Sequence, residues 1–243
     1  MKLMTFSSRT LKEILRDPLN LIFGLGFPII LILLLSAIQA NVPVSLFEIE
    51  TLTPGITVFG LSFMTLFSAT LIAKDRESAL LQRLYTTPLT AVDFIFGYAL
   101  PVLPIAVAQC IICYIVAVIL GLSVTATILY ALLFIIPVSV FFIGLGLLCG
   151  SVFNAKQVGG ICGALLTNLT AWLSGTWFDL DLVGGVFKTI ANVLPFVHAV
   201  ELERAVLGGS YGDIPVHLLW VLGYMAVTVA AAVALFLRQM KRQ

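Results

Sequence analysis

Six long apolar stretches, separated by short polar segments, constrain the fold of this chain more than any other feature of its sequence. They cover roughly residues 19–39, 54–73, 93–120, 125–149, 157–175 and 216–237. A helix of about 20 apolar residues crosses the hydrocarbon core of a bilayer, where the backbone must satisfy its own hydrogen bonds. With 60% hydrophobic and 10% charged residues, the chain is too apolar for a water-soluble domain. The sequence therefore predicts an all-α polytopic membrane protein with six transmembrane helices.

Several of these stretches are bounded by residues that favour helix ends. Residues 90–93 (TAVD) and 154–157 (NAKQ) resemble capping boxes, in which the first and fourth side chains each bond the other residue's backbone N–H. Thr53 precedes Pro54, which suits the first position of a helix. Gly121 suits the end of the third stretch.

Basic residues predict the orientation of the chain. An even number of crossings puts both termini on one side, and the positive-inside rule makes that side cytoplasmic. It holds eleven basic residues: Lys2, Arg9, Lys12, Arg16, Lys74, Arg76, Arg83, Lys156, Arg238, Lys241 and Arg242. The outer side holds Lys188 and Arg204, together with most acidic residues: Glu48, Glu50, Asp179, Asp181, Glu201, Glu203 and Asp213.

The N-terminal residues 1–17 mix apolar and basic side chains at helical spacing and lack the apolar core of a signal peptide. They predict a helix that lies in the membrane interface, with a solvated helical tail as the alternative. The expected location is the cell (inner or plasma) membrane, crossed several times, with both termini in the cytoplasm.

The predicted spans carry no charged residue or histidine near their middle. Such a residue would cost about 2.5–3.5 kcal/mol and would indicate an ion or proton relay. The absence of nucleophile–base and metal–ligand patterns also disfavours an intramembrane enzyme. Cys110 and Cys113 have C-x-x-C spacing, but within an apolar run they are expected to pack as small apolar side chains. We predict no catalytic residue, no metal site, no cofactor bound by this chain and no nucleic-acid partner.

One compact polar segment, residues 74–93 (KDRESALLQRLYTTPLTAVD), interrupts the apolar sequence on the predicted cytoplasmic side. Pro88 ends its helical part, because proline disfavours helical geometry at the preceding residue. An amphipathic helix held between two spans is suited to docking in a partner's groove, whereas a helix that only lies on lipid is the alternative. The residues that share one helical face are Glu77, Leu80, Leu81 and Leu84.

Residues 71–100, LIAKDRESALLQRLYTTPLTAVDFIFGYAL, resemble the cytoplasmic segment of type-2 ATP-binding-cassette (ABC) permeases. The matching positions are Asp75, Arg76, Glu77, Leu80, Leu84, Thr87, Pro88 and Leu89, with Ser78 and Ala79 in place of the usual Gly-Thr. Residues 144–209 resemble the second half of the same family, except that Asp179 stands where many members have proline. The matching positions there are Leu173, Ser174, Gly175, Phe178, Pro195, Phe196, Arg204, Leu207 and Gly208.

The resemblance implies one ABC-2 type transmembrane domain over residues 1–243. It implies an interfacial helix at 1–17, a coupling helix at 74–85 and a broken outer hairpin at 179–209. It also implies a second permease subunit, either a copy or a related chain, and two copies of an ABC ATP-binding subunit that carry ATP and Mg. Contacts with that subunit would fall to Asp75, Arg76, Glu77, Leu80, Leu81, Arg83 and Leu84.

Spans two and five commonly face the partner permease in this family, which suggests polar candidates for a translocation path. The candidates are Thr65, Ser68, Asn168 and Thr170, with hydrogen bonding between helices as the alternative role. The expected function is that of a membrane permease subunit of an ATP-driven exporter. It would move a drug-like, peptide antibiotic or lipid-like solute out of the cell by alternating access. Export of a polysaccharide or glycolipid, and a non-transporting membrane scaffold, are the alternatives.

Overall fold

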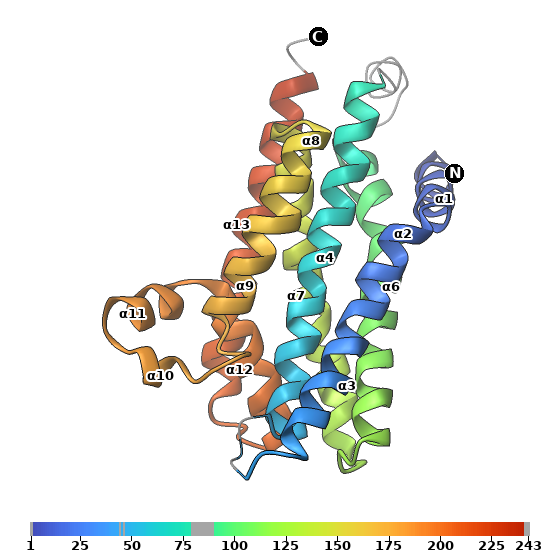
Figure 1. Cartoon of the computed structure of the whole chain (residues 1–243). Coiled ribbons are helices and arrows are strands. Elements are labelled where there is room, and N and C mark those ends of the chain that lie inside the picture. The colour runs from blue at the N-terminus through green and yellow to red at the C-terminus, as the bar shows by residue number, and fades with distance from the viewer. Residues whose placement is uncertain (1, 44, 46, 79–89, 241–243) are drawn as a thin grey trace.

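The computed structural model describes residues 2–43, 45, 47–78 and 90–240, and it is helical with no strand over this part of the chain (Figure 1). The first half contains α1 (Lys2–Leu15), α2 (Pro18–Leu21), the π-helical segment η1 (Ile22–Gly26), α3 (Phe27–Gln39), α4 (Ile49–Glu77) and α6 (Ala91–Ile119). The second half contains α7 (Ala126–Val152), α8 (Ala155–Val158), the π-helical segment η2 (Gly159–Leu166), α9 (Thr167–Leu173), α10 (Leu180–Val183), α11 (Gly185–Val193), α12 (Pro195–Gly208) and α13 (Ile214–Met240). The predicted all-α class is confirmed for these residues.

Five helices in the described part are long and apolar enough to cross a membrane. They are Ile22–Gln39, Ile49–Glu77, Val92–Ile119, Ala126–Val152 and Ile214–Arg238. The predicted fifth span, 157–175, corresponds to the consecutive segments α8, η2 and α9. Lys156, Gln157 and Asn168 make this stretch less apolar than the other five. The count of six spans therefore stays a prediction.

Helix α4 forms the centre of the bundle (Figure 1). It packs against α3, α6, α7, α9, α12 and η2, and it is buried along most of its length. The helix begins at Ile49, earlier than the sequence predicts, so that Thr53 and Pro54 lie inside it. A helix with no face left for lipid can carry polar side chains along its length, provided that they find hydrogen-bond partners.

The close contact between α4 and α7 depends on two glycines spaced four residues apart. Gly146 and Gly150 of α7 face α4, and a Cβ built on Gly146 would lie 2.5 Å from the carbonyl oxygen of Thr65. Thr65 donates a hydrogen bond to the carbonyl oxygen of Phe142 (2.8 Å), which crosses the same contact. Small residues at this spacing let two helices approach to backbone distance in membranes.

We expect Gly146→Ala to destabilise the protein by about 1–3 kcal/mol, because the new methyl group would overlap the backbone of α4. Thermal unfolding of the purified chain measures this as a lower Tm. Gly223→Ala is the matched control, since Gly223 of α13 has open space around it and alanine favours a helix. An unchanged Tm in Gly146→Ala would contradict the close contact.

The predicted outer hairpin, residues 179–209, contains α10, α11 and α12. The chain is extended at Leu194, Pro195 begins α12, and Gly209 ends α12 in the left-handed conformation that glycine favours (φ 73°). Arg204 ties α12 to its surroundings by donating hydrogen bonds to the backbone oxygens of Gly175 (2.9 Å) and Thr51 (3.3 Å). The hairpin is thus fixed to the start of α4 and to the loop after α9.

Helix α1 lies at the same end of the bundle as α8 and the C-terminal ends of α4 and α13 (Figure 1). Its face around Phe6 packs on α6, where the ring of Phe6 meets Tyr98 edge-on with centroids 5.0 Å apart. Met4 and Leu15 are exposed on another face. Exposed apolar side chains on a short amphipathic helix fit the predicted interfacial position, which stays a prediction because the structure contains no membrane.

Candidate functional site

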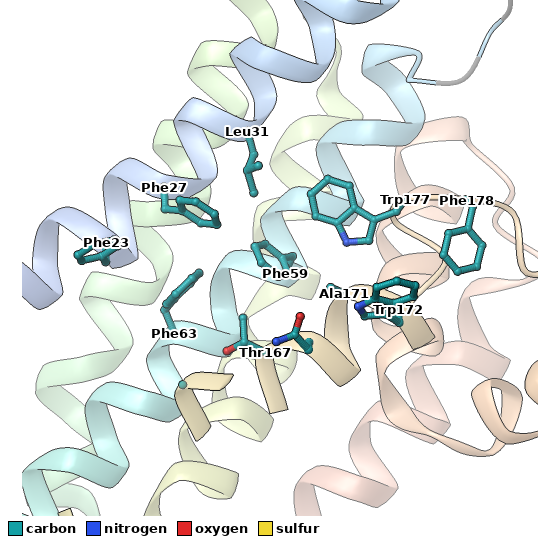
Figure 2. A pocket seen from close by; sticks show the side chains of 12 residues that line it. Phe23, Phe27, Leu31, Phe59, Phe63, Thr167, Ala171, Trp172, Trp177 and Phe178 are labelled. Atoms are coloured by element: carbon teal, nitrogen blue, oxygen red, sulfur yellow. The ribbon is translucent and has the colours of Figure 1, made fainter. Parts of the chain in front are cut away.

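A cavity of about 610 Å³ lies between α3, α4, η2 and α9, within the size range of small-molecule pockets (Figure 2). In Figure 2, Phe23, Phe27 and Phe63 lie on one side of it and Trp172, Trp177 and Phe178 on the other. The other lining residues are Leu31, Phe59, Gly163, Thr167, Asn168 and Ala171. The lining is therefore mainly aromatic.

The aromatic side chains hold one another in place across the helices. The ring centroid of Phe59 on α4 lies 5.8 Å from those of Phe63 and Trp177, in edge-to-face arrangements. The centroid of Phe27 on α3 lies 5.8 Å from that of Phe63. Such pairs contribute about 0.5–1.5 kcal/mol each beyond the area they bury. The cavity wall is consequently a mainly apolar surface held together by contacts between aromatic rings.

Asn168 supplies an amide to this apolar wall. Its Nδ2 donates a hydrogen bond to the carbonyl oxygen of Ala164 (2.8 Å), which leaves its side-chain carbonyl oxygen without a partner among the described residues. Thr167 also lines the cavity, but its hydroxyl donates to the carbonyl oxygen of Cys162 (3.0 Å). Asn168 is therefore positioned to accept a hydrogen bond from a solute.

Of the four predicted path residues, Asn168 lines the cavity and the other three do not. Thr65 and Ser68 are fully buried at the contact between α4 and α7, where Ser68 donates to the carbonyl oxygen of Met64 (2.6 Å). Thr170 is also fully buried and donates to the carbonyl oxygen of Leu166 (2.9 Å). The structure brings Thr65 and Ser68 together but separates them from Asn168, and the transport role of all four stays a prediction.

A second feature is a junction of helix ends around residues 75–77, the first part of the predicted coupling segment. The Asp75 side chain is buried and accepts two hydrogen bonds from Arg9 of α1 (2.6 and 2.8 Å). The hydroxyl of Tyr98 on α6 donates a third (2.6 Å). The hydrogen bond with Asp75 raises the pKa of the Arg9 guanidinium above its ordinary value. Asp75 thereby joins α1, α4 and α6.

Arg76 and Glu77 join α4 to the turn between α7 and α8. The Arg76 guanidinium donates to the carbonyl oxygens of Gly150 (2.9 Å) and Phe153 (3.4 Å), at the C-terminus of α7. The Glu77 carboxylate accepts from the backbone N–H of Ala155 (2.9 Å), at the N-terminus of α8. A cation at a helix C-terminus and an anion at a helix N-terminus both complement the helix dipole.

The junction therefore ties the end of α4 to four other helical elements through three consecutive charged residues. Leu80, Leu81, Arg83 and Leu84 lie outside the described residues, so the coupling helix at 74–85 stays a prediction. Lys74 to Glu77 form the last turn of α4 in the structure. The sequence indicated the charged residues of α4 but not their partners Arg9 and Tyr98, because these are far away along the chain.

In the described part of the chain, no cluster of three or more histidine, cysteine, aspartate or glutamate residues could hold a metal ion. Cys110 and Cys113 are buried and form no disulfide. The two features are thus a mainly apolar cavity and a polar junction between helix ends.

Comparisons with known proteins agree with this description. Residues 1–208 match the sequence profile of the ABC-2 type transporter family. The "Putative transport permease ycf38" of Porphyra purpurea is 31% identical over 213 residues, which cover 83% of this chain and 72% of that protein. The "ABC transporter G family member 20" of Dictyostelium discoideum is 28% identical over 193 residues, which cover 76% of this chain and 26% of that protein, so this chain spans about a quarter of its length. The chain belongs to the ABC-2 type transporter family and is a membrane permease of that family.

Proposed function

We propose that this chain is the membrane subunit of an ATP-driven exporter for drug-like, peptide antibiotic or lipid-like solutes. ATP is hydrolysed on a separate ABC ATP-binding subunit, two copies of which dock at the predicted cytoplasmic end. Their closure pushes on segment 74–85, and the spans rotate as nearly rigid bodies to change the side on which the path opens. The chain itself breaks and makes no covalent bond.

The observation that carries this proposal is the aromatic cavity beside α4 in a chain of this family. A solute there would meet aromatic rings and an amide, and no charged side chain is among the cavity's lining residues. Aromatic faces bind apolar rings and delocalised cations, whereas a polysaccharide needs many hydrogen-bonding groups along its path. The cavity chemistry therefore favours apolar or weakly polar cargo over sugar polymers.

A second permease subunit would complete the path. Trp172 of α9, which lines the cavity, and Leu165 of η2 have more than half of their surface exposed (55% and 57%). Exposed apolar side chains of this size on a spanning segment must face either lipid or another membrane subunit. We propose that a copy of this chain or a related permease covers this face, so that the two subunits share the path.

Transport of the dye rhodamine 6G into inside-out vesicles tests the proposal. Vesicles that contain the permease and its ATP-binding subunit should accumulate the dye when ATP is added, and those that lack either subunit should not. Accumulation without ATP, or accumulation by the permease alone, would contradict the exporter mechanism. If ATP drives a labelled oligosaccharide and none of a panel of apolar dyes, the proposed cargo is wrong although the energy source is right.

We expect Asn168→Ala to raise the dye concentration for half-maximal transport about five- to tenfold. The change removes one hydrogen-bond acceptor from the cavity, which corresponds to about 1 kcal/mol. Leu169→Ala is the matched control, because Leu169 is the next residue on the same helix but does not line the cavity. Equal effects of the two changes would indicate that Asn168 does not contact the solute.

A further inference from the structure

Helix α12 carries one carboxyl group into the interior of the protein. The side chain of Glu203 is fully buried. The sequence places this residue with the acidic residues of the outer side, and that placement stays a prediction. The position follows from helical spacing, because Phe196, Val200 and Glu203 are four and three residues apart and share the buried face of α12. Glu201, two residues earlier, is partly exposed and pairs with Arg204 (2.8 Å).

Among the described residues, Glu203 has one hydrogen-bond partner and no cation as a partner. The hydroxyl of Tyr114 on α6 donates to its Oε2 (3.0 Å), while its Oε1 is buried without a partner among the described residues. Arg204 is next to it in sequence, but its guanidinium is held by Glu201 and by the backbone oxygens of Gly175 and Thr51. The negative charge of an ionised Glu203 would therefore be uncompensated.

The other titratable groups near Glu203 do not supply a positive charge. On α6, the facing groups are Tyr114 and the thiol of Cys110. The remaining elements packed on α12 carry outer-side groups at Glu50 (α4), Tyr130 (α7), Lys188 (α11), His217 and Tyr224 (α13). None of the groups on these remaining elements shifts the pKa of Glu203. Burial raises the pKa of Glu203 from 4.5 to about 8, and the hydrogen bond from Tyr114 opposes this rise.

We propose that Glu203 is a proton-binding site that links the contact between α6 and α12 to pH. In the packed arrangement the carboxyl group holds a proton and its charge is absent. Any movement of the hairpin that admits water to the side chain lets it ionise, and the proton passes to water. Each closing of this contact then takes up one proton from the solvent, and each opening releases it.

The direction of the pH effect follows from the raised pKa. Between about pH 4.5 and about pH 8, the packed protein binds one more proton at this site than a form with Glu203 in water. The stability of the packed arrangement therefore falls as the pH rises through this window and becomes constant above it. The lower stability favours opening of the hairpin at alkaline pH. This pH dependence goes beyond the proposed transport function and does not depend on that function.

Thermal unfolding of the purified full chain as a function of pH tests the proposal without a transport assay. We expect the Tm of the unmodified protein to fall by about 5 °C or more between about pH 5 and about pH 8, and Glu203→Gln, which mimics the protonated group, to remove most of this fall. Glu201→Gln on the same helix is the matched control and should keep it. Because other groups can also contribute to the pH dependence of Tm, the compared quantity is the difference between the unmodified protein and each variant.

Infrared spectroscopy gives an independent answer if Glu203→Gln folds poorly. The unmodified protein at about pH 7 should show the carbonyl band of a protonated carboxylic acid, and this band should disappear as the pH is raised past about 8. Tyr114→Phe removes the hydrogen bond that favours the ionised form, so the midpoint should shift upward. Absence of the band at neutral pH, or an unchanged pH dependence of Tm in Glu203→Gln, would overturn the proposal.

Discussion

Replacing Leu80 and Leu81 together by aspartate is expected to abolish ATP-driven transport while the protein still inserts into the membrane. If the predicted coupling helix docks in a groove of the ATP-binding subunit, these leucines would be its anchors, and apolar anchors of this kind each contribute about 2 kcal/mol or more to binding. Two buried carboxylates in their place would weaken the complex about a thousandfold or more. Dye accumulation in vesicles measures the loss.

The matched control changes the same two positions but keeps them apolar, without the charges of the aspartate variant. Leu80→Met combined with Leu81→Met should retain most of the transport, because methionine fills similar space and adapts to the groove. Membrane content and Tm of all variants are compared first, so that a folding defect is recognised. If the aspartate variant is inserted at the normal level and transports at the normal rate, segment 74–85 does not couple the two subunits.

The second large effect is expected from Arg9→Ala, which should destabilise the protein by about 2–4 kcal/mol. Asp75 is buried, and the loss of Arg9 removes the cation that pairs with its negative charge. The hydrogen bond from Tyr98 to the carboxylate would remain. Asp75→Asn should cost less, because the amide still accepts from Tyr98 and the partly exposed Arg9 side chain (39%) can turn to water. Thermal unfolding of the purified chain measures both changes.

Lys12→Ala is the control for this pair of variants. Lys12 lies three residues after Arg9 on the same helix, is exposed, and makes no ion pair with the described residues, so its loss removes the same charge without breaking the junction. Its effect should stay within about 0.5 kcal/mol. If Arg9→Ala were equally mild, the junction would not hold α1 to α4 as the structure indicates.

The long helices could be predicted from the sequence because their signals are local. Apolar length identifies the five helices that meet the criteria for crossing a membrane, and both predicted capping boxes are confirmed, at Thr90 with Asp93 and at Asn154 with Gln157. Gly121 has a positive φ just after the third span, as predicted. The capping boxes and the glycine depend on residues within about one turn, and apolar length depends on about 20 consecutive residues. No knowledge of the tertiary structure is needed to detect these signals.

The candidate site was less predictable because its contacts join distant parts of the chain. The polarity of Thr65 and Ser68 indicated either a path or a contact between helices, and the choice depends on glycines of α7 about 80 residues later. The aromatic residues of the cavity give no signal in an apolar sequence, where they resemble ordinary packing. For Glu203, the spacing from Phe196 and Val200 was a usable signal of burial on one face of a helix.

The central claim, that an ATP-binding subunit binds segment 74–85, is tested most directly by photo-crosslinking. A photoreactive benzoylphenylalanine in place of Leu80 should form a covalent adduct with the ATP-binding subunit on irradiation of the assembled membranes, and the adduct yield should change when ATP is added. The same label in place of Leu129 is the control and should form no such adduct. Leu129 is exposed and lies near the N-terminus of α7, whereas the junction with residues 75–77 lies at the C-terminus of that helix. Adducts of the Leu80 label with lipid alone, in membranes that transport normally, would contradict the account.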